Sequence, residues 1–245
     1  MIQALALPTR KDEDFRYADL AALGQVWPVA VETIAVAAGE SGNLALVLDG
    51  DQPVARELAI VLGDGASFDL RVLTAPAAYG RVAVKVELGT GASFTLGAAQ
   101  LAGGQQTVEI VTDVLHARPD AVSRQVVRSV AGGRATVNYL GKVRVAQGAD
   151  GTDGEQSVRA MLLDRTATAN ARPELEIFAD DVKCAHGCAV GELDANGLFY
   201  MAQRGLPPAE AKKLMLQAFV AEAFTGAADE KHLLEAALAA LGRLV

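Results

Sequence analysis

GDGASFDL, residues 63–70, returns as GTGASFTL, residues 89–96, with six of eight positions identical and an offset of 26 residues. A repeat of roughly 20 to 50 residues is typical of solenoids, in which each repeat forms one coil that stacks on its neighbours. A fainter echo, GGRATVNYL, begins at Gly132. Two similar hairpin strands of a β-sandwich would also produce such an echo, so the repeat by itself leaves both folds open.

The segments around the repeat alternate apolar and polar residues, which is the pattern of half-buried β-strands. RVAVKVEL (81–88), TVEIVTDV (107–114) and ELEIF (174–178) all follow this pattern. In the second of them, Val108, Ile110 and Val114 share one face, and Glu109 and Asp113 share the other. From about residue 34 to residue 200, short apolar runs separated by Gly, Asp and Asn predict one all-β unit.

Helical patterns occur at the two ends of the chain. PPAEAKKLMLQAFVAEAF (207–224) predicts an amphipathic helix that ends near Gly226, and DEKHLLEAALAAL (229–241) predicts a second helix that packs against it. The inner stripe expected for the first helix is Ala211, Leu214, Met215, Ala218, Phe219 and Glu222. The charged segment TRKDEDFRYADL (9–20) predicts a short helix or arm.

Composition excludes several classes of protein. The chain has 245 residues, is 51% hydrophobic and carries a net charge of −8, which opposes binding to nucleic acid or to anionic lipid. Neither a secretory signal nor a transmembrane run is expected, because Pro8 interrupts the apolar start and charges interrupt the Ala-rich stretches. The two cysteines form no disulfide framework, so the cytoplasm is the expected location.

One segment, DDVKCAHGCAVG (180–191), gathers potential metal ligands, because Cys184, His186 and Cys188 recur at every second residue. On a strand all three point to one side, with successive Cα atoms about 6.5 to 7 Å apart. One tetrahedral zinc ion needs donors closer together, about 3.8 Å apart, so an unbroken strand would at most offer one or two ligands to a centre shared with another chain. Two buried cysteines and an ordinary surface histidine remain the alternative interpretation. No other catalytic motif is apparent.

PELEIFADDVKCAHGCAVGELDANGLFYMAQRG, residues 173–205, resembles the SufB/SufD family of iron-sulfur cluster assembly proteins. Its most specific parts are LEIFADDVKCAHG and LFY followed by RG, and weaker matches are YLGKVRVAQ from Tyr139, AFVAEAF and EDFRYADL. A SufB-type chain is not expected to carry DDVKCAHG here, so the resemblance favours the SufD-type branch. Cys188 departs from the family pattern, which usually has a small residue there.

The resemblance implies a mainly β protein with a right-handed parallel β-helix over residues 33–200, an N-terminal arm over 1–32 and a small helical domain over 201–245. It implies a non-enzymatic scaffold that pairs with a homologous SufB-like subunit and docks SufC, an ABC-type ATPase, and it leaves open a homodimer in isolation. Cys184 and His186 would hold a nascent, transient iron-sulfur cluster as iron ligands at the SufB interface. No tightly bound cofactor is expected in the isolated chain. The expected SufC-docking residues are Leu206, Lys212, Gln217, Val220 and Phe224.

Two other functions are compatible with a β-helix. A carbohydrate-active enzyme, such as a polyuronate lyase or hydrolase, would normally be secreted and would line its cleft with acidic, basic and aromatic residues. The sequence shows neither feature. A structural zinc protein would need a fourth ligand, and no residue near the two cysteines supplies one.

Overall fold

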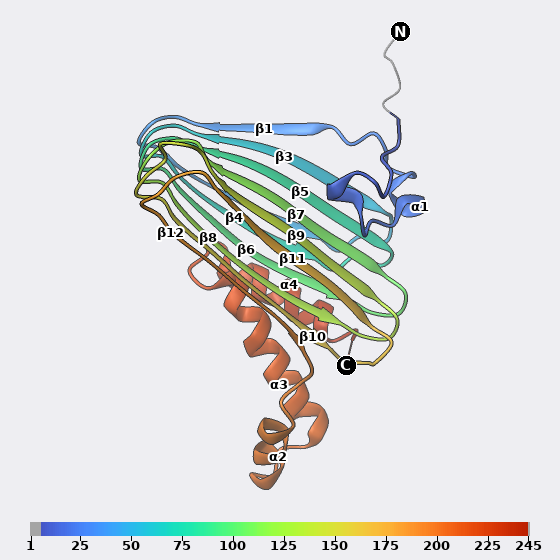
Figure 1. Ribbon diagram of the computed structural model, residues 1–245. Coiled ribbons are helices and arrows are strands. Elements are labelled where there is room, and N and C mark those ends of the chain that lie inside the picture. Colours follow the sequence, from blue (N-terminus) through green and yellow to red (C-terminus); the bar gives the residue numbers. More distant parts are fainter. Residues whose placement is uncertain (1–5, 245) are drawn as a thin grey trace.

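The computed structural model describes residues 6–244, and its strands form two parallel sheets of six strands each (Figure 1). The first sheet contains β1 (Val31–Val36), β3 (Val54–Leu62), β5 (Tyr79–Leu88), β7 (Thr107–His116), β9 (Thr136–Val145) and β11 (Thr168–Ile177). The second contains β2 (Ser41–Leu48), β4 (Ser67–Thr74), β6 (Ser93–Ala102), β8 (Val122–Ala131), β10 (Asp153–Leu162) and β12 (Lys183–Gly191). Consecutive strands alternate between the sheets, so the chain winds as a parallel β-helix and the sandwich alternative is wrong.

The register explains the sequence repeat. Ser67 and Phe68 of β4 pair with Ser93 and Phe94 of β6, 26 residues further on. The preceding turns place Gly65 and Gly91 at the same corner with φ of 66° and 61°, a conformation that glycine adopts without strain. The fainter echo at Gly132 opens β9 in the other sheet, so it belongs to the opposite corner.

The lumen of the β-helix holds the main hydrophobic core. Leu70 and Leu96 stack in register, and so do Phe68 and Phe94, all of them buried. The inward residues expected in β5 and β7 are buried as well: Val82, Val84, Val86, Leu88, Val108, Ile110 and Val114. Period-two alternation therefore predicted the inner face of these strands correctly.

The C-terminal part contains α2 (Ala195–Gln203), α3 (Pro208–Ala221) with the one-turn helix η2 (Glu222–Phe224), and α4 (Glu230–Leu241). The end of α3, η2 and α4 cover the outer face of the second sheet, whereas α2 packs on α3 and projects away from the sheet (Figure 1). Arg71 of β4 donates to the carbonyl of Ala223 at 2.8 Å, and a Cβ on Gly97 would overlap that same carbonyl oxygen. Buried Arg128 of β8 binds both carboxylate oxygens of Glu222 at 2.7 and 2.8 Å.

The buried face of α3 differs from the expected stripe. Leu216 and Val220 are fully buried against the sheet, whereas Leu214 is 48% exposed. Phe224 of η2 is fully buried too. The expectation that Val220 and Phe224 meet a partner is therefore wrong for this conformation, because these side chains fill the space between the helices and β4, β6 and β8.

The N-terminal arm lies on the outer face of the first sheet, on the opposite side from the helices (Figure 1). It contains η1 (Glu13–Phe15) and α1 (Leu20–Leu23). Arg81 of β5 and Glu109 of β7 form an ion pair beneath it, 4% and 1% exposed. Glu109 also accepts from the backbone N–H of Asp19, and Arg81 donates to the carbonyl of Asp14. The arm thus buries Glu109, which alternation alone would leave in solvent.

The helical part begins earlier than the sequence predicts. The last strand ends at Gly191, and α2 begins at Ala195 within the range expected for the β-helix. Asp194 starts this helix, because its carboxylate accepts from the backbone N–H groups of Asn196 and Gly197. Among the described residues no helix is long and apolar enough to cross a membrane.

Candidate functional site

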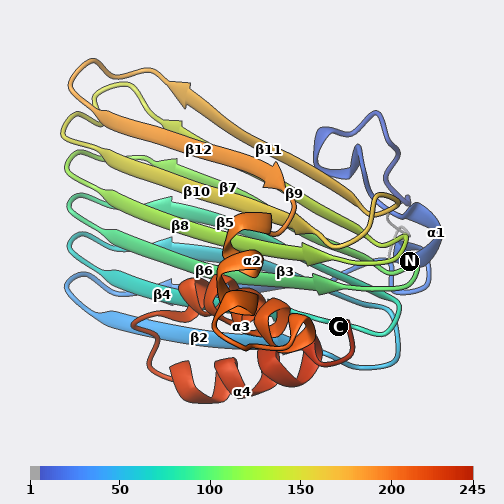
Figure 2. The same ribbon diagram turned by 90° about the horizontal axis from the view of Figure 1, so that it is seen from below.

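The candidate ligands lie on β12, which is the last strand of its sheet. This strand pairs with β10 on one side, and no described element pairs with its other edge (Figure 2). In the same view β11 ends the first sheet, so the two strands together form an open end of the β-helix. Residues on this end are accessible to another molecule.

The register places the three candidate ligands on the lumen side of β12. Cys184 pairs with Gly154, His186 with Gln156 and Cys188 with Val158, and all three β10 residues are buried. Because paired residues in parallel strands point to the same face, the three side chains line the rim of the lumen together. The predicted one-sided arrangement of the three residues is therefore confirmed.

Exposure differs sharply between the last two coils. Gln156 is 1% exposed, whereas His186, one strand further, is exposed because no coil stacks beyond it. Cys188 is also exposed and Cys184 is half-buried. A Cβ on Gly154 would lie 3.5 Å from the Sγ of Cys184 and 3.6 Å from the Oγ of Ser123. The thiol of Cys184 therefore lies over the lumen, in van der Waals range of the position that a side chain at Gly154 would take.

The lumen beneath the rim contains buried polar side chains among its apolar ones, a feature that the sequence analysis missed. Gln156 donates to the hydroxyl of Tyr139 at 3.2 Å, and this hydroxyl donates to Gln125 at 3.3 Å. In the column that leads to His186, leucines of the early coils give way to Gln125 and Gln156. The sequence did contain a sign of this polar region. Gln125 and Gln156 occupy positions of β8 and β10 that alternation assigns to the interior, where an apolar residue is the usual choice.

A buried histidine occupies the same region. His116, at the end of β7, is fully buried, and its Nε2 lies 2.9 Å from the Oγ of Ser123. Burial lowers the pKa of His116 to about 4, because the charged imidazolium would lose its hydration. His116 is therefore a neutral hydrogen-bonding residue near neutral pH.

Both thiols are harder to ionise than a free cysteine. Burial raises the pKa of Cys184, partly offset by a backbone hydrogen bond from Gly154, and burial also raises the pKa of Cys188. Since the thiolate is the form that binds metal, a metal ion or a positive group must displace the proton. No group of three or more His, Cys, Asp or Glu side chains in residues 6–244 is arranged to hold a metal ion.

The residues expected to dock an ATPase separate into two groups. Leu206, Lys212 and Gln217 are half-buried and reachable, whereas Val220 and Phe224 are core residues. The structure adds three exposed large apolar side chains on α2 and α3, two helices that pack on each other: Phe199, Tyr200 and Leu214 are 66%, 59% and 48% exposed. We call these three residues the α2–α3 patch. Sequence reasoning missed it because it assigned the first two residues to the β-helix.

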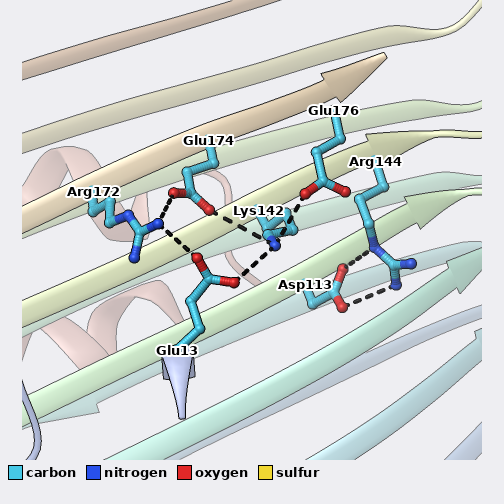
Figure 3. A network of polar contacts seen from close by, with 7 residues as sticks. All are labelled: Glu13, Asp113, Lys142, Arg144, Arg172, Glu174 and Glu176. Atoms are coloured by element: carbon cyan, nitrogen blue, oxygen red, sulfur yellow. Dashed lines mark hydrogen bonds and ion pairs between the residues drawn. The ribbon is translucent and has the colours of Figure 1, made fainter. Parts of the chain in front are cut away.

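A charged network fastens the arm close to the open end (Figure 3). Glu13 of the arm contacts Arg172 of β11 at 2.6 Å and Lys142 of β9 at 3.4 Å. Lys142 also contacts Glu174 and Glu176 of β11. The guanidinium of Arg172 and the ammonium of Lys142 lower the pKa of Glu13. The network thus ties the outer face of the last coil to the N-terminal arm.

The protein is thus a parallel β-helix with a helical C-terminal part, and cysteine and histidine side chains line the rim of its open end. Residues 48–219 match the model of the family described as SUF system FeS cluster assembly, SufBD core domain. The chain therefore belongs to the SufB/SufD family, and its relatives make it SufD-like.

Three relatives illustrate the similarity. SufD of Escherichia coli strain K12 is 36% identical over 121 residues, 49% of this chain and 28% of that protein. The SufBD family protein slr0076 of Synechocystis is 33% identical over 125 residues, 51% of this chain and 28% of that protein. SufD of Bacillus subtilis strain 168 is 30% identical over 118 residues, 48% and 27% respectively. Each match therefore spans little more than a quarter of the relative.

Proposed function

We propose that this chain is a non-enzymatic scaffold subunit of a SUF iron-sulfur cluster assembly complex. A homologous SufB-like subunit pairs with the open end of the β-helix, and the two subunits together hold a nascent cluster. Cys184 and His186 supply iron ligands from this chain. The cluster is cargo that passes on to other proteins, so its binding is transient.

One observation supports this proposal most strongly. The last strand presents a thiol and an imidazole on one side while its backbone edge lacks a partner among the described residues. An unpaired strand edge favours pairing with another chain, and thiolate and imidazole are both suitable ligands for iron. The family membership of residues 48–219 supports an iron-sulfur cluster as the cargo.

The test is coexpression with SufB-like and SufC-type proteins, followed by measurement of iron and acid-labile sulfide in the purified complex. Cys184→Ser and His186→Ala should each lower the cluster content at least several-fold. Both residues stand at an open rim, so the melting temperature should change little. His232→Ala, on the exposed side of α4, is the matched control and should retain full cluster content. Full cluster content in the rim variants would refute the proposal.

We also propose that the helical part docks the SufC-type ATPase. The contact would combine reachable residues of the expected segment, Leu206, Lys212 and Gln217, with the apolar α2–α3 patch. An exposed apolar patch bordered by polar side chains is typical of a protein-binding surface. The buried Val220 and Phe224 would support this surface from beneath.

Point variants test the docking proposal without uncovering the core. Lys212→Glu and Leu214→Asp should weaken capture of the ATPase at least several-fold and leave the fold intact, because Leu214 is 48% exposed. Lys231→Glu is the control, since its side chain is 92% exposed and it lies on α4, which carries none of the patch residues. Equal capture by all variants would refute docking of the ATPase at this surface.

We also propose a cytoplasmic location, because the two free thiols suit a reducing compartment.

A further inference from the structure

The side-chain amide of Gln156 is held in one orientation by its neighbours in the lumen. Burial raises the pKa of Tyr139 to about 12, so the phenol keeps its proton, and it donates this proton to Oε1 of Gln125 at 3.3 Å. The phenol oxygen in turn accepts from Nε2 of Gln156 at 3.2 Å. The nitrogen of the Gln156 amide thus faces Tyr139, and its oxygen needs a donor from another direction.

That oxygen is buried without a hydrogen-bond donor. Gln156 is 1% exposed, and no group among the described residues donates to its Oε1. An unsatisfied buried acceptor costs about 1–3 kcal/mol, so a donor within reach is favoured. A carbonyl oxygen has two lone pairs, and the unpaired Nε2 of Gln125, one coil below, can use only one of them. The second lone pair remains for a donor from the open end.

His186 is the residue that faces Gln156 from the open end. The two residues pair in the register of β10 and β12, and no described strand follows β12 in its sheet. Neighbouring strands lie about 4.8 Å apart, and Nδ1 of a histidine stands at a similar distance from the backbone as the amide of a glutamine. Because the imidazole is exposed, it can rotate until Nδ1 is within hydrogen-bond distance of Oε1.

The other side-chain donors on the lumen side of β12 are directed elsewhere. The thiol of Cys188 donates to the carbonyl of Ala171, at 4.0 Å between Sγ and the oxygen. The thiol of Cys184 lies over Gly154, where a Cβ would be 3.5 Å from Sγ. Both cysteines also stand two residues from His186, about 6.7 Å along the strand. The imidazole is therefore the donor that this strand offers to Gln156.

We propose that Gln156 is a positioning residue for His186, and that its Oε1 accepts a hydrogen bond from the Nδ1–H of the imidazole. A neutral imidazole carries one N–H, so a proton held on Nδ1 leaves Nε2 free to bind metal. Metal-binding histidines commonly donate their other N–H to an oxygen, which fixes the ring and its tautomer. The inference rests on the proposed function, in which His186 binds iron, and it adds the buried residue that orients this ligand.

The tautomer of His186 in the isolated full-length chain tests the hydrogen bond without any cluster or partner. Ring-nitrogen chemical shifts are measured by NMR at about pH 8, where an ordinary imidazole, with a pKa of about 6.5, is neutral. The chain has three histidines, so His116→Gln and His232→Gln complete the assignment. We expect the proton of His186 on Nδ1. A wild-type chain with the proton mainly on Nε2 would overturn the inference.

Matched substitutions identify the acceptor. Gln156→Met removes the amide at similar side-chain length, so Nδ1–H should cease to be the main tautomer of His186. Gln125→Met is the control, because it removes an equally buried amide of the same network one coil further from His186. Both variants should lower the melting temperature, but only Gln156→Met should change the tautomer. An unchanged tautomer in Gln156→Met, or an equal change in both variants, would refute the role of Gln156.

Cluster content then separates this inference from the proposed function. In the coexpressed complex, Gln156→Met should lower iron and acid-labile sulfide about tenfold, a usual loss when the partner of a metal-binding histidine is removed. Gln125→Met should retain the cluster. Full cluster content in Gln156→Met, with the expected loss in His186→Ala, would refute positioning and leave the proposed function standing. Full content in His186→Ala would refute iron binding by this residue, whatever tautomer the isolated chain shows.

Discussion

Acid should destabilise this protein through His116, and the structure gives the size of the effect. His116 is fully buried beside Ser123, and its folded-state pKa is about 4, compared with 6.5 for the ordinary group. The unfolded chain therefore binds a proton more readily than the folded chain does. Stability from this residue is complete above about pH 6.5 and decreases as the pH falls towards 4.

The two pKa values differ by about 2.5, and each unit corresponds to about 1.4 kcal/mol, so the loss approaches about 3 kcal/mol at pH 4. Carboxylates titrate in the same range, so wild type must be compared with His116→Gln, which stays neutral and can still bond to Ser123. Between pH 7 and pH 4 the wild type should lose about 3 kcal/mol more free energy of unfolding than the variant.

Urea unfolding at a series of pH values, followed by circular dichroism, measures this difference. Replacement of a solvent-exposed histidine, His232→Gln, should leave the free energy of unfolding within about 0.5 kcal/mol of wild type. Parallel pH curves for wild type and His116→Gln would refute the reasoning. They would mean that His116 gains its proton without unfolding, for example because the open end admits water to the lumen.

Three further outcomes follow from packing and charge. Gly97→Ala should cost about 1–3 kcal/mol because its Cβ overlaps the carbonyl of Ala223, whereas Gly191→Ala, with nothing within 4 Å, should stay within about 0.5 kcal/mol in the same urea assay. Glu109→Gln leaves buried Arg81 without its charged partner and should cost about 3 kcal/mol in the urea assay, and a loss below about 1 kcal/mol would refute this. Glu13→Gln breaks an exposed contact, because the Glu13 side chain is 52% exposed, and should cost less than about 1 kcal/mol. A larger loss in the same urea assay would contradict this expectation.

The sequence predicts the coil architecture because two successive turns of the same conformation are followed by strands that pair in register. Gly65 and Gly91 turn the chain in the same way, and the residues after them pair directly. The repeat then fades because the coils lengthen: Thr136 pairs with Thr168, 32 residues further on. A longer coil keeps the register of its strands, but it moves the matching residues out of a fixed offset. One clear echo is therefore what this solenoid leaves in its sequence.

Helix faces and buried charges were harder to predict, because they depend on elements distant in sequence. On α3 several apolar residues compete for the inner face, and contact with β6 and β8 selects Leu216 and Val220 over Leu214. Glu109 occupies an outward position that alternation assigns to solvent, and only the arm, 90 residues away, buries it. Local periodicity carries no information about either partner.

The candidate site shows the same division between local pattern and global position. Gln156 and His186 hold the same inward position on neighbouring strands, yet only His186 is exposed. A further coil would bury the imidazole as completely as it buries the amide, and would occupy the edge of β12. The chain leaves the β-helix instead, because Asp194 caps a helix three residues after the strand ends. The ligands are therefore available because the β-helix ends at β12. Period-two spacing of Cys184, His186 and Cys188 would be the same in an interior coil, where the side chains would be buried.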